Sequence, residues 1–106
     1  MAESILDLTA ETFEAARSGL WLLDFWGEWC GPCRALEPVL SELAGEVTGA
    51  RIGKVEIGAN PDLASAFAIT SVPTVLILRD GQRVKTLVGS RTKLQLARAL
   101  AQAAAE

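Results

Sequence analysis

Apolar residues along the chain follow two different spacings, which separate strands from helices. Residues 20–26 are apolar except for Asp24, and this run predicts a central strand covered on both faces. From Cys33 onward the spacing becomes helical, and Pro38 inside that pattern indicates a kink rather than an end. The residues that define the helix are Leu36, Val39, Leu40, Leu43 and Val47.

The N-terminal part predicts one further strand and one further helix. Residues 5–8 can form a short strand, and Thr9 can cap a helix that runs through Phe13 and Ala16. Gly19 is suited to end that helix.

The second half of the chain predicts three strands, the last two of them joined by a tight turn. Residues 51–57 are expected to form the first of these strands, after which Asn60-Pro61-Asp62 supplies a cap, a proline and an acid for a short helix. Residues 74–78 and 83–88 flank Asp80-Gly81, a pair typical of antiparallel hairpins.

A closing helix should begin at Ser90 or Thr92. Its apolar face is expected to consist of Leu94, Ala97, Leu100, Ala101 and Ala104. The order βαβαβαββα predicts an α/β fold with a mixed sheet and helices on both faces, formed by residues 1–106 as a single domain.

Composition narrows the class of protein. Half of the 106 residues are hydrophobic and 22% are charged, so a packed globule is expected. The net charge is −3 with the basic residues scattered, which argues against nucleic acid or an anionic membrane as a partner. The start MAESILDLTA lacks the basic region of a signal peptide, and we expect a cytoplasmic protein.

Cys30 and Cys33 are the only cysteines of the chain. In a reducing compartment a pair three positions apart is better interpreted as redox-active or metal-binding than as a structural bridge. Two cysteines without any histidine cannot complete a zinc site unless two chains share the ion, so we expect no metal.

The cysteines lie between the apolar strand and the long helix, at a helix N-terminus. Partial positive charge and free N–H groups at that end lower a cysteine pKa, and Cys30 is therefore the expected nucleophile. Residues three apart in a helix have Cα atoms about 5 Å apart, which allows a disulfide to close. Cys30 would attack a substrate disulfide, and Cys33 would resolve the mixed disulfide.

The segment LLDFWGEWCGPC resembles the active-site strand and motif of thioredoxins, and SVPT at positions 71–74 is similar to their cis-proline loop. GKVEIGANP, the Asp-Gly hairpin and Val88-Gly89 also resemble thioredoxin segments in the same order, so the resemblance covers essentially all 106 residues. It implies the thioredoxin fold, with a central mixed sheet of about five strands and four flanking α-helices. Strand order comes from the resemblance alone.

Asp24 is the most informative charged residue. Its place in an apolar strand should desolvate it and raise its pKa toward neutrality, although an edge aspartate with ordinary titration is the alternative. The resemblance implies that Asp24 is the general base for Cys33. It also matches Lys54 to a family lysine beside this acid, which adds Lys54 to the catalytic group; the alternative is a solvated surface lysine.

The resemblance also implies a substrate-binding surface around Cys30. Val72-Pro73 matches the family's cis peptide, where the residue before proline offers backbone hydrogen bonds to an extended substrate. The expected substrate-binding residues are Trp29, Gly31, Pro32, Val72, Pro73 and Gly89. Two departures from the family pattern, Gly27 and Gly58, could alter surface recognition.

By this resemblance the protein is expected to be a monomeric protein-disulfide reductase. It would bind no cofactor of its own and would receive electrons from NADPH through a flavin-containing thioredoxin reductase. One alternative is a thioredoxin-fold binding or holdase subunit of a larger assembly. Another is an oxidant or isomerase of a secretory compartment, against which the lack of an export signal and of a histidine between the cysteines both count.

Overall fold

Strand β2 (Leu20–Trp26) lies at the centre of a five-stranded sheet in the computed structural model, which describes residues 5–106. The strand order is β1-β3-β2-β4-β5, and β1 (Ile5–Asp7), β3 (Arg51–Glu56) and β2 run parallel. Strands β4 (Thr74–Arg79) and β5 (Gln82–Val88) are antiparallel to their neighbours. The predicted mixed sheet is therefore confirmed. Residues 1–4, which belong to the segment from which we argued against a signal peptide, lie outside the described residues.

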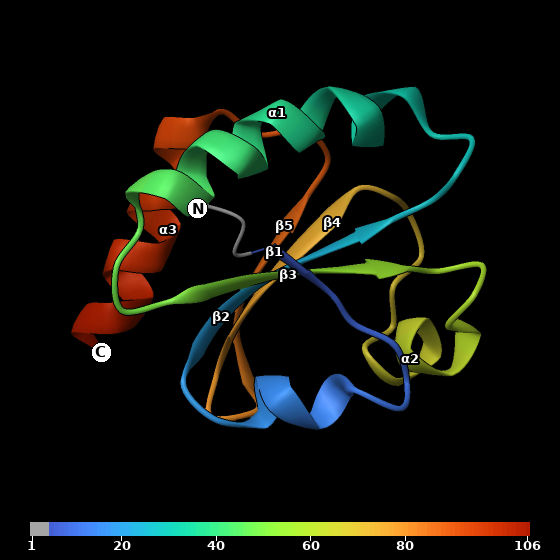
Figure 1. Ribbon diagram of the computed structural model, residues 1–106, viewed down its shortest axis with the longest axis horizontal. Helices are drawn as coiled ribbons and strands as arrows, with labels where there is room; N and C mark the ends of the chain where they lie inside the picture. The colour runs from blue at the N-terminus through green and yellow to red at the C-terminus, as the bar shows by residue number, and fades with distance from the viewer. Residues whose placement is uncertain (1–4) are drawn as a thin grey trace.

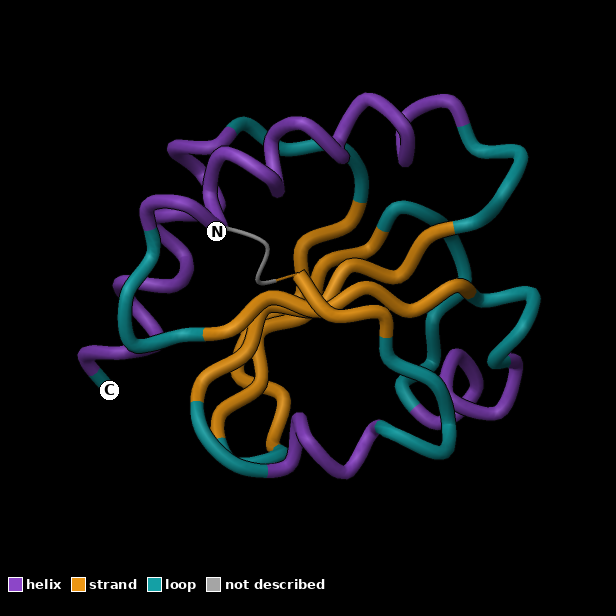
Figure 2. The backbone as a smooth tube through the Cα atoms, in the orientation of Figure 1, coloured by secondary structure: helices purple, strands orange, loops and turns teal. Residues whose placement is uncertain are grey.

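Helices cover both faces of the sheet (Figure 1). Helices α1 (Gly31–Glu46) and α3 (Lys93–Ala105) pack on one face, where Leu22 of β2 meets their buried leucines. The 3-10 helix η1 (Phe13–Arg17) and α2 (Pro61–Ala66) lie on the other face of the sheet (Figure 2). Leu23 and Phe25 of β2 belong to the buried cluster on that face, together with Phe13 of η1. Because side chains alternate along a strand, Asp24 faces α1 together with Leu22.

The first predicted helix, and with it the expectation of four α-helices, was wrong. The structure has three α-helices within residues 5–106, and residues 13–17 form the 3-10 helix η1. Thr9 does not cap it, because its backbone N–H donates to Thr12 Oγ1 at 2.9 Å in a local turn. The buried residues of η1, Phe13 and Ala16, are three positions apart, a spacing that lies on one side of a 3-10 helix and of an α-helix alike.

Helix α3 starts where the sequence predicts, but it buries a different face. Thr92 and Gln95 form a capping box, with each side chain accepting from the other's backbone N–H at 3.1 and 2.9 Å. The expected face was wrong in part: Leu100 is buried as expected, but Leu94 is 59% exposed, and Ala101 and Ala104 are exposed as well. Alanines at almost every turn leave two overlapping apolar stripes, and packing against α1 and the sheet selects one of them. The buried residues are Leu96, Ala99, Leu100 and Ala103.

The hairpin between β4 and β5 turns at Asp80 and Gly81, as predicted. Both residues have positive φ, 51° and 84°, which a two-residue hairpin turn of this type requires. Asn60 occupies the N-cap position of α2, but its side chain makes no capping hydrogen bond, contrary to the prediction. It accepts from Ala10 N at 3.1 Å and donates to the Glu56 carbonyl at 3.0 Å, so it ties the loop before η1 to β3.

None of the helices within residues 5–106 is both long and apolar enough to cross a membrane.

Candidate redox site

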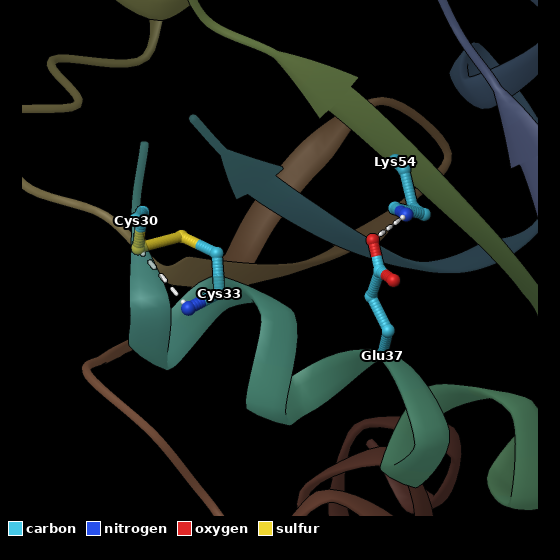
Figure 3. A network of polar contacts seen from close by, with 4 residues as sticks. All are labelled: Cys30, Cys33, Glu37 and Lys54. Atoms are coloured by element: carbon cyan, nitrogen blue, oxygen red, sulfur yellow. Dashed lines mark hydrogen bonds and ion pairs between the residues drawn. A yellow bond between two sulfur atoms is a disulfide. The ribbon is translucent and has the colours of Figure 1, made fainter. Parts of the chain in front are cut away.

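The two cysteines form a disulfide at the N-terminal end of α1 (Figure 3). Cys30 is the N-cap residue of the helix and Cys33 lies in its first turn, with their Cα atoms 5.2 Å apart. Pro32 also lies in the first turn, where a missing N–H costs the helix no hydrogen bond. The helix begins at the motif because strand β2 ends four residues earlier and the chain turns across its carboxyl end.

The two sulfurs are not equivalent. Cys33 is 2% exposed, whereas Cys30 is only partly buried. The backbone N–H of Cys33 donates to Cys30 Sγ at 3.1 Å, so the same N–H is placed to stabilise a Cys30 thiolate when the disulfide opens. Cys30 is therefore the sulfur that another molecule can reach.

Asp24 lies in the middle of β2 with 0% of its surface exposed. In the sheet register it pairs with Lys54 on β3 and Val75 on β4, and neither carboxyl oxygen has a hydrogen-bond partner within residues 5–106. Burial raises the pKa of Asp24 from 3.8 to about 7, the positive charge of Lys54 opposes this rise, and the negative charge of Glu37 adds to it. The predicted desolvation of Asp24 is thus confirmed, and the edge-aspartate alternative is excluded.

Lys54 is not a solvated surface lysine, because its side chain is only 16% exposed. Its ammonium lies 2.9 Å from Glu37 Oε2 and 4.8 Å from the centre of the Trp26 ring. Figure 3 shows Glu37 reaching from α1 across to Lys54 on the neighbouring strand. The lysine is held between a helix carboxylate and an aromatic face.

Glu37 is the residue of this site that the sequence analysis did not single out. It follows Cys33 by four positions, and residues at that spacing share one face of a helix. Since Cys33 faces the sheet, this spacing was a signal that could have placed Glu37 near the buried acid.

An open groove of about 520 Å³ lies beside Cys30. Trp29 and Val72 line it, as do the acidic residues Glu28 and Glu56. Trp29 is 91% exposed, which is unusual for the largest apolar side chain. The structure thus brings Trp29 and Val72 together with the reactive sulfur, as the sequence analysis expected.

Four other expected substrate-binding residues lie at the helix start or near the cis-proline rather than on this groove. The Val72–Pro73 peptide is cis, Pro73 is buried, and its carbonyl accepts from Gly89 N at 2.8 Å. Gly31 and Pro32 are exposed in the first turn of α1. A role of any of these residues in substrate binding stays a prediction.

Both departures from the family pattern line the groove. Gly27 and Gly58 contribute to its wall together with Cys30. The Glu56 carboxylate accepts from Gly58 N at 3.0 Å and from Ala59 N at 2.8 Å, and a Cβ at position 58 would lie 2.9 Å from Glu56 Oε2. Glycine at position 58 therefore lets the Glu56 carboxylate fold back onto the backbone.

Within residues 5–106, no three His, Cys, Asp or Glu side chains are grouped to hold a metal ion.

The position of the disulfide on this fold defines a class of protein. A reversible pair at a helix N-terminus, with one accessible sulfur, one buried sulfur and a buried carboxyl on the adjacent strand, is suited to thiol-disulfide exchange. The class is that of the thiol-disulfide oxidoreductases.

Comparison with known proteins identifies the family. The thioredoxin family model matches residues 4–102. The chain is 42% identical to a thioredoxin of Staphylococcus haemolyticus over 92% of its length and 95% of that protein's. It is 44% identical to one of Listeria monocytogenes, over 87% of this chain and 91% of the other. The chain belongs to the thioredoxin family.

A solved structure agrees with this assignment. A single-residue mutant of a thioredoxin from Halobacterium salinarum superposes with a TM-score of 0.87 at 31% identity, covering 95% of this chain and 91% of the other. The thioredoxin fold expected from the sequence is confirmed, and the protein is a thiol-disulfide oxidoreductase with Cys30 and Cys33 as its redox-active pair.

Proposed function

We propose that the protein reduces disulfides of other proteins, with Cys30 as the nucleophile and Cys33 as the resolving thiol. The observation that carries this assignment is the difference in exposure of the two sulfurs, since only Cys30 is open to a macromolecular substrate. The hydrogen bond from Cys33 N to Cys30 Sγ adds support, because it favours negative charge on the outer sulfur.

The reaction proceeds by two exchanges. The Cys30 thiolate attacks one sulfur of the substrate disulfide, which forms a mixed disulfide and releases the first substrate thiolate. Cys33 loses its proton and attacks Cys30 Sγ, which releases the second substrate thiolate and closes the Cys30–Cys33 disulfide. Two electrons pass to the substrate, whose two thiolates take up the two protons that the cysteines lost.

Asp24 is proposed as the group that accepts the Cys33 proton. A base that titrates near the working pH is efficient in proton transfer, and burial brings the pKa of Asp24 to about 7. Asp24 and Cys33 both lie between β2 and α1, the carboxyl on the strand and the thiol on the helix. Lys54 would moderate the Asp24 charge from the neighbouring strand.

Substrates are proposed to bind in the groove beside Cys30. Trp29 and Val72 offer apolar contact next to the reactive sulfur, and an extended substrate segment would pair with the backbone at Val72. Gly31, Pro32, Pro73 and Gly89 would complete this surface by their resemblance to the family. Apolar contact with few fixed polar groups suits a broad range of protein substrates.

Several further properties rest on the family. We propose that the oxidised protein is recycled by a flavin-containing thioredoxin reductase that uses NADPH, and that this chain binds no cofactor. We also propose that it acts in the cytoplasm as a monomer, with residues 1–106 forming one domain.

Trapping of the mixed disulfide tests the proposal. The Cys33→Ser variant, incubated with insulin, should form a covalent adduct through Cys30 that mass spectrometry detects and dithiothreitol releases. Cys30→Ser is the matched control and should form none, because its remaining thiol is buried. Equal trapping by both variants would contradict the assignment of the nucleophile. A binding or holdase subunit would instead retain its partner with both cysteines replaced.

A further inference from the structure

Lys54 lies between two carboxyl groups and is bonded to only one of them. In the sheet register it is the direct neighbour of Asp24, yet its ammonium donates to Glu37 Oε2 at 2.9 Å. Neither oxygen of Asp24 accepts a hydrogen bond within residues 5–106. The cation nearest the buried acid is thus turned toward the helix.

We propose that Glu37 is a positioning residue, which holds the Lys54 ammonium away from Asp24 and so keeps the buried carboxyl able to exchange a proton with Cys33. This inference rests on the proposed function, in which Asp24 is the proton acceptor. It assigns to Glu37 a part in the reaction although Glu37 touches neither sulfur nor substrate.

The geometry leaves Lys54 few other positions. The side chain is 16% exposed, and its ammonium stands 4.8 Å from the centre of the Trp26 ring. Glu37 and Cys33 are one helical turn apart on α1, so the same helix face carries the resolving thiol and the partner of Lys54. The ion pair meets solvent at a cleft of about 240 Å³ lined also by Asp7 and Ser41.

Other charged groups near Asp24 do not replace Glu37. Asp7 on β1 is beside Lys54 in the register, but it is exposed. The Glu56 carboxylate on β3 is engaged by backbone N–H groups. Strand β4 and helix α3 contribute uncharged residues, such as Val75 and Leu96, to the core between the sheet and α1 in which Asp24 lies. Among residues 5–106, Glu37 is the one carboxylate paired with Lys54.

The consequence for the reaction follows from the charges. In the resolving step the Cys33 proton passes to the Asp24 carboxylate, and the new thiolate attacks Cys30 Sγ. If Lys54 donated directly to Asp24, the ionised carboxylate would be stabilised and its pKa would fall, which makes a weaker base. The Glu37 charge also raises the pKa of Asp24 through space, after the larger effects of burial and Lys54. Both effects of Glu37 act in the same direction.

The titration of Asp24 tests the inference directly. The oxidised protein is suited to this measurement, because neither cysteine titrates, and the carboxyl carbon of Asp24 is followed by 13C NMR against pH. Glu37→Gln should lower the midpoint, by on the order of 0.5 to 1 unit for one partly screened neighbouring charge and a new hydrogen bond. Glu46→Gln is the matched control, because Glu46 also lies on α1 and bonds a lysine, Lys93 at 2.6 Å, and it should leave the midpoint unchanged.

Repeating the Glu37→Gln titration in a Lys54→Met variant distinguishes the positioning of Lys54 from the direct effect of the Glu37 charge on Asp24. In Lys54→Met the stem over Trp26 is largely kept but no ammonium remains, so Glu37→Gln should shift the midpoint by clearly less than it does in the wild type. An equal shift in both backgrounds would overturn the positioning role, and so would the absence of any shift in the wild-type background.

The effect of Glu37 on the reaction itself is measured by the pH profile of insulin reduction. The acid limb of the pH profile of insulin reduction should move to lower pH in Glu37→Gln, in parallel with the Asp24 midpoint. A profile that does not move would overturn the inference. The NMR titration requires no turnover, and trapping through Cys30 requires no Asp24, so failure of this inference is distinguishable from failure of the proposed function.

Discussion

The raised pKa of Asp24 follows from its buried position in β2. A carboxyl with 0% exposure and no hydrogen-bond donor within residues 5–106 is stabilised in its neutral form, because ionisation in such a site is costly. Lys54 offsets part of this cost. The burial that raises the pKa of Asp24 must therefore also lower the stability of the folded protein at neutral pH.

Replacement of Asp24 by Asn should stabilise the protein, and increasingly so as the pH rises. The pKa of Asp24 is raised on folding from 3.8 to about 7, so between these values the folded state binds more protons than the unfolded state. As the pH rises through this window, the free energy of unfolding of the wild-type protein therefore falls by roughly 1.4 kcal/mol per pH unit because of Asp24. Urea denaturation of both proteins should show a gap that is small near the lower value and widest above pH 7.

The matched control for this prediction is Glu11→Gln, which removes one negative charge at an exposed position. Its difference from the wild type should stay nearly constant with pH. An Asp24→Asn gap that is equally independent of pH would contradict the raised pKa of Asp24.

The residues that could be predicted were those with a local signal. Cys30 and Cys33 are defined by spacing and by the helix that follows, and Asp24 by its apolar strand. Glu37 was missed because its contact with Lys54 depends on the rotation of α1 over the sheet and on the direction that the Lys54 side chain takes. Both follow from tertiary packing, which no short stretch of sequence encodes.

At the scale of elements, α3 shows that local sequence determines where a helix starts more strongly than it determines which face of the helix is buried. The capping box of Thr92 and Gln95 satisfies backbone N–H groups that the first turn leaves free, and this depends on neighbours in the sequence only. The buried face is decided by packing against α1 and the sheet, which explains why the predicted start was confirmed while most of the predicted face was wrong.

Thr92→Ala should destabilise the protein by about 1 kcal/mol, the usual cost of losing an N-cap side chain. Chemical denaturation monitored by circular dichroism measures this change. Thr48→Ala, in the exposed loop between α1 and β3, is the comparison and should change stability by less than about 0.5 kcal/mol. Equal effects of the two substitutions would contradict the capping role of Thr92.

Strands were predicted more accurately than the first helix for a physical reason. Buried strands such as β2 and β4 need long apolar runs, which are visible in the sequence. The segment at η1 buries only Phe13 and Ala16, and this pattern fits an α-helical turn and a 3-10 turn about equally well. The turn between Thr9 and Thr12 occupies the residues at which the predicted α-helix would have begun.

For the molecule as a whole, sheet order brings the site together. Strand β2 lies between β3, which supplies Lys54, and β4, which follows Val72 and Pro73. Helix α1 separates β2 from β3 along the chain, and β4 lies further on still, so periodicity could predict the strands but not their order. That order was expected from the resemblance to thioredoxins, and the parallel and antiparallel pairings of the structure now define it.

The oxidised protein should be more stable than the reduced protein by about 2 kcal/mol, because the disulfide closes a very short loop and restricts the unfolded chain only slightly. Denaturation with and without dithiothreitol measures this difference. The Cys30→Ser variant, which cannot form the internal disulfide, should show no response to the reductant. A reduced protein more stable than the oxidised one would contradict this expectation and would indicate an oxidant rather than a reductant.

Insulin reduction with dithiothreitol as electron donor is the decisive measurement for the assignment of Cys30. The wild-type protein should accelerate the precipitation of the insulin B chain, and Cys30→Ser should leave the reaction at the rate of dithiothreitol alone. If the wild type gives no acceleration, or if Cys30→Ser accelerates the reaction equally, Cys30 is not the nucleophile of a protein-disulfide reductase.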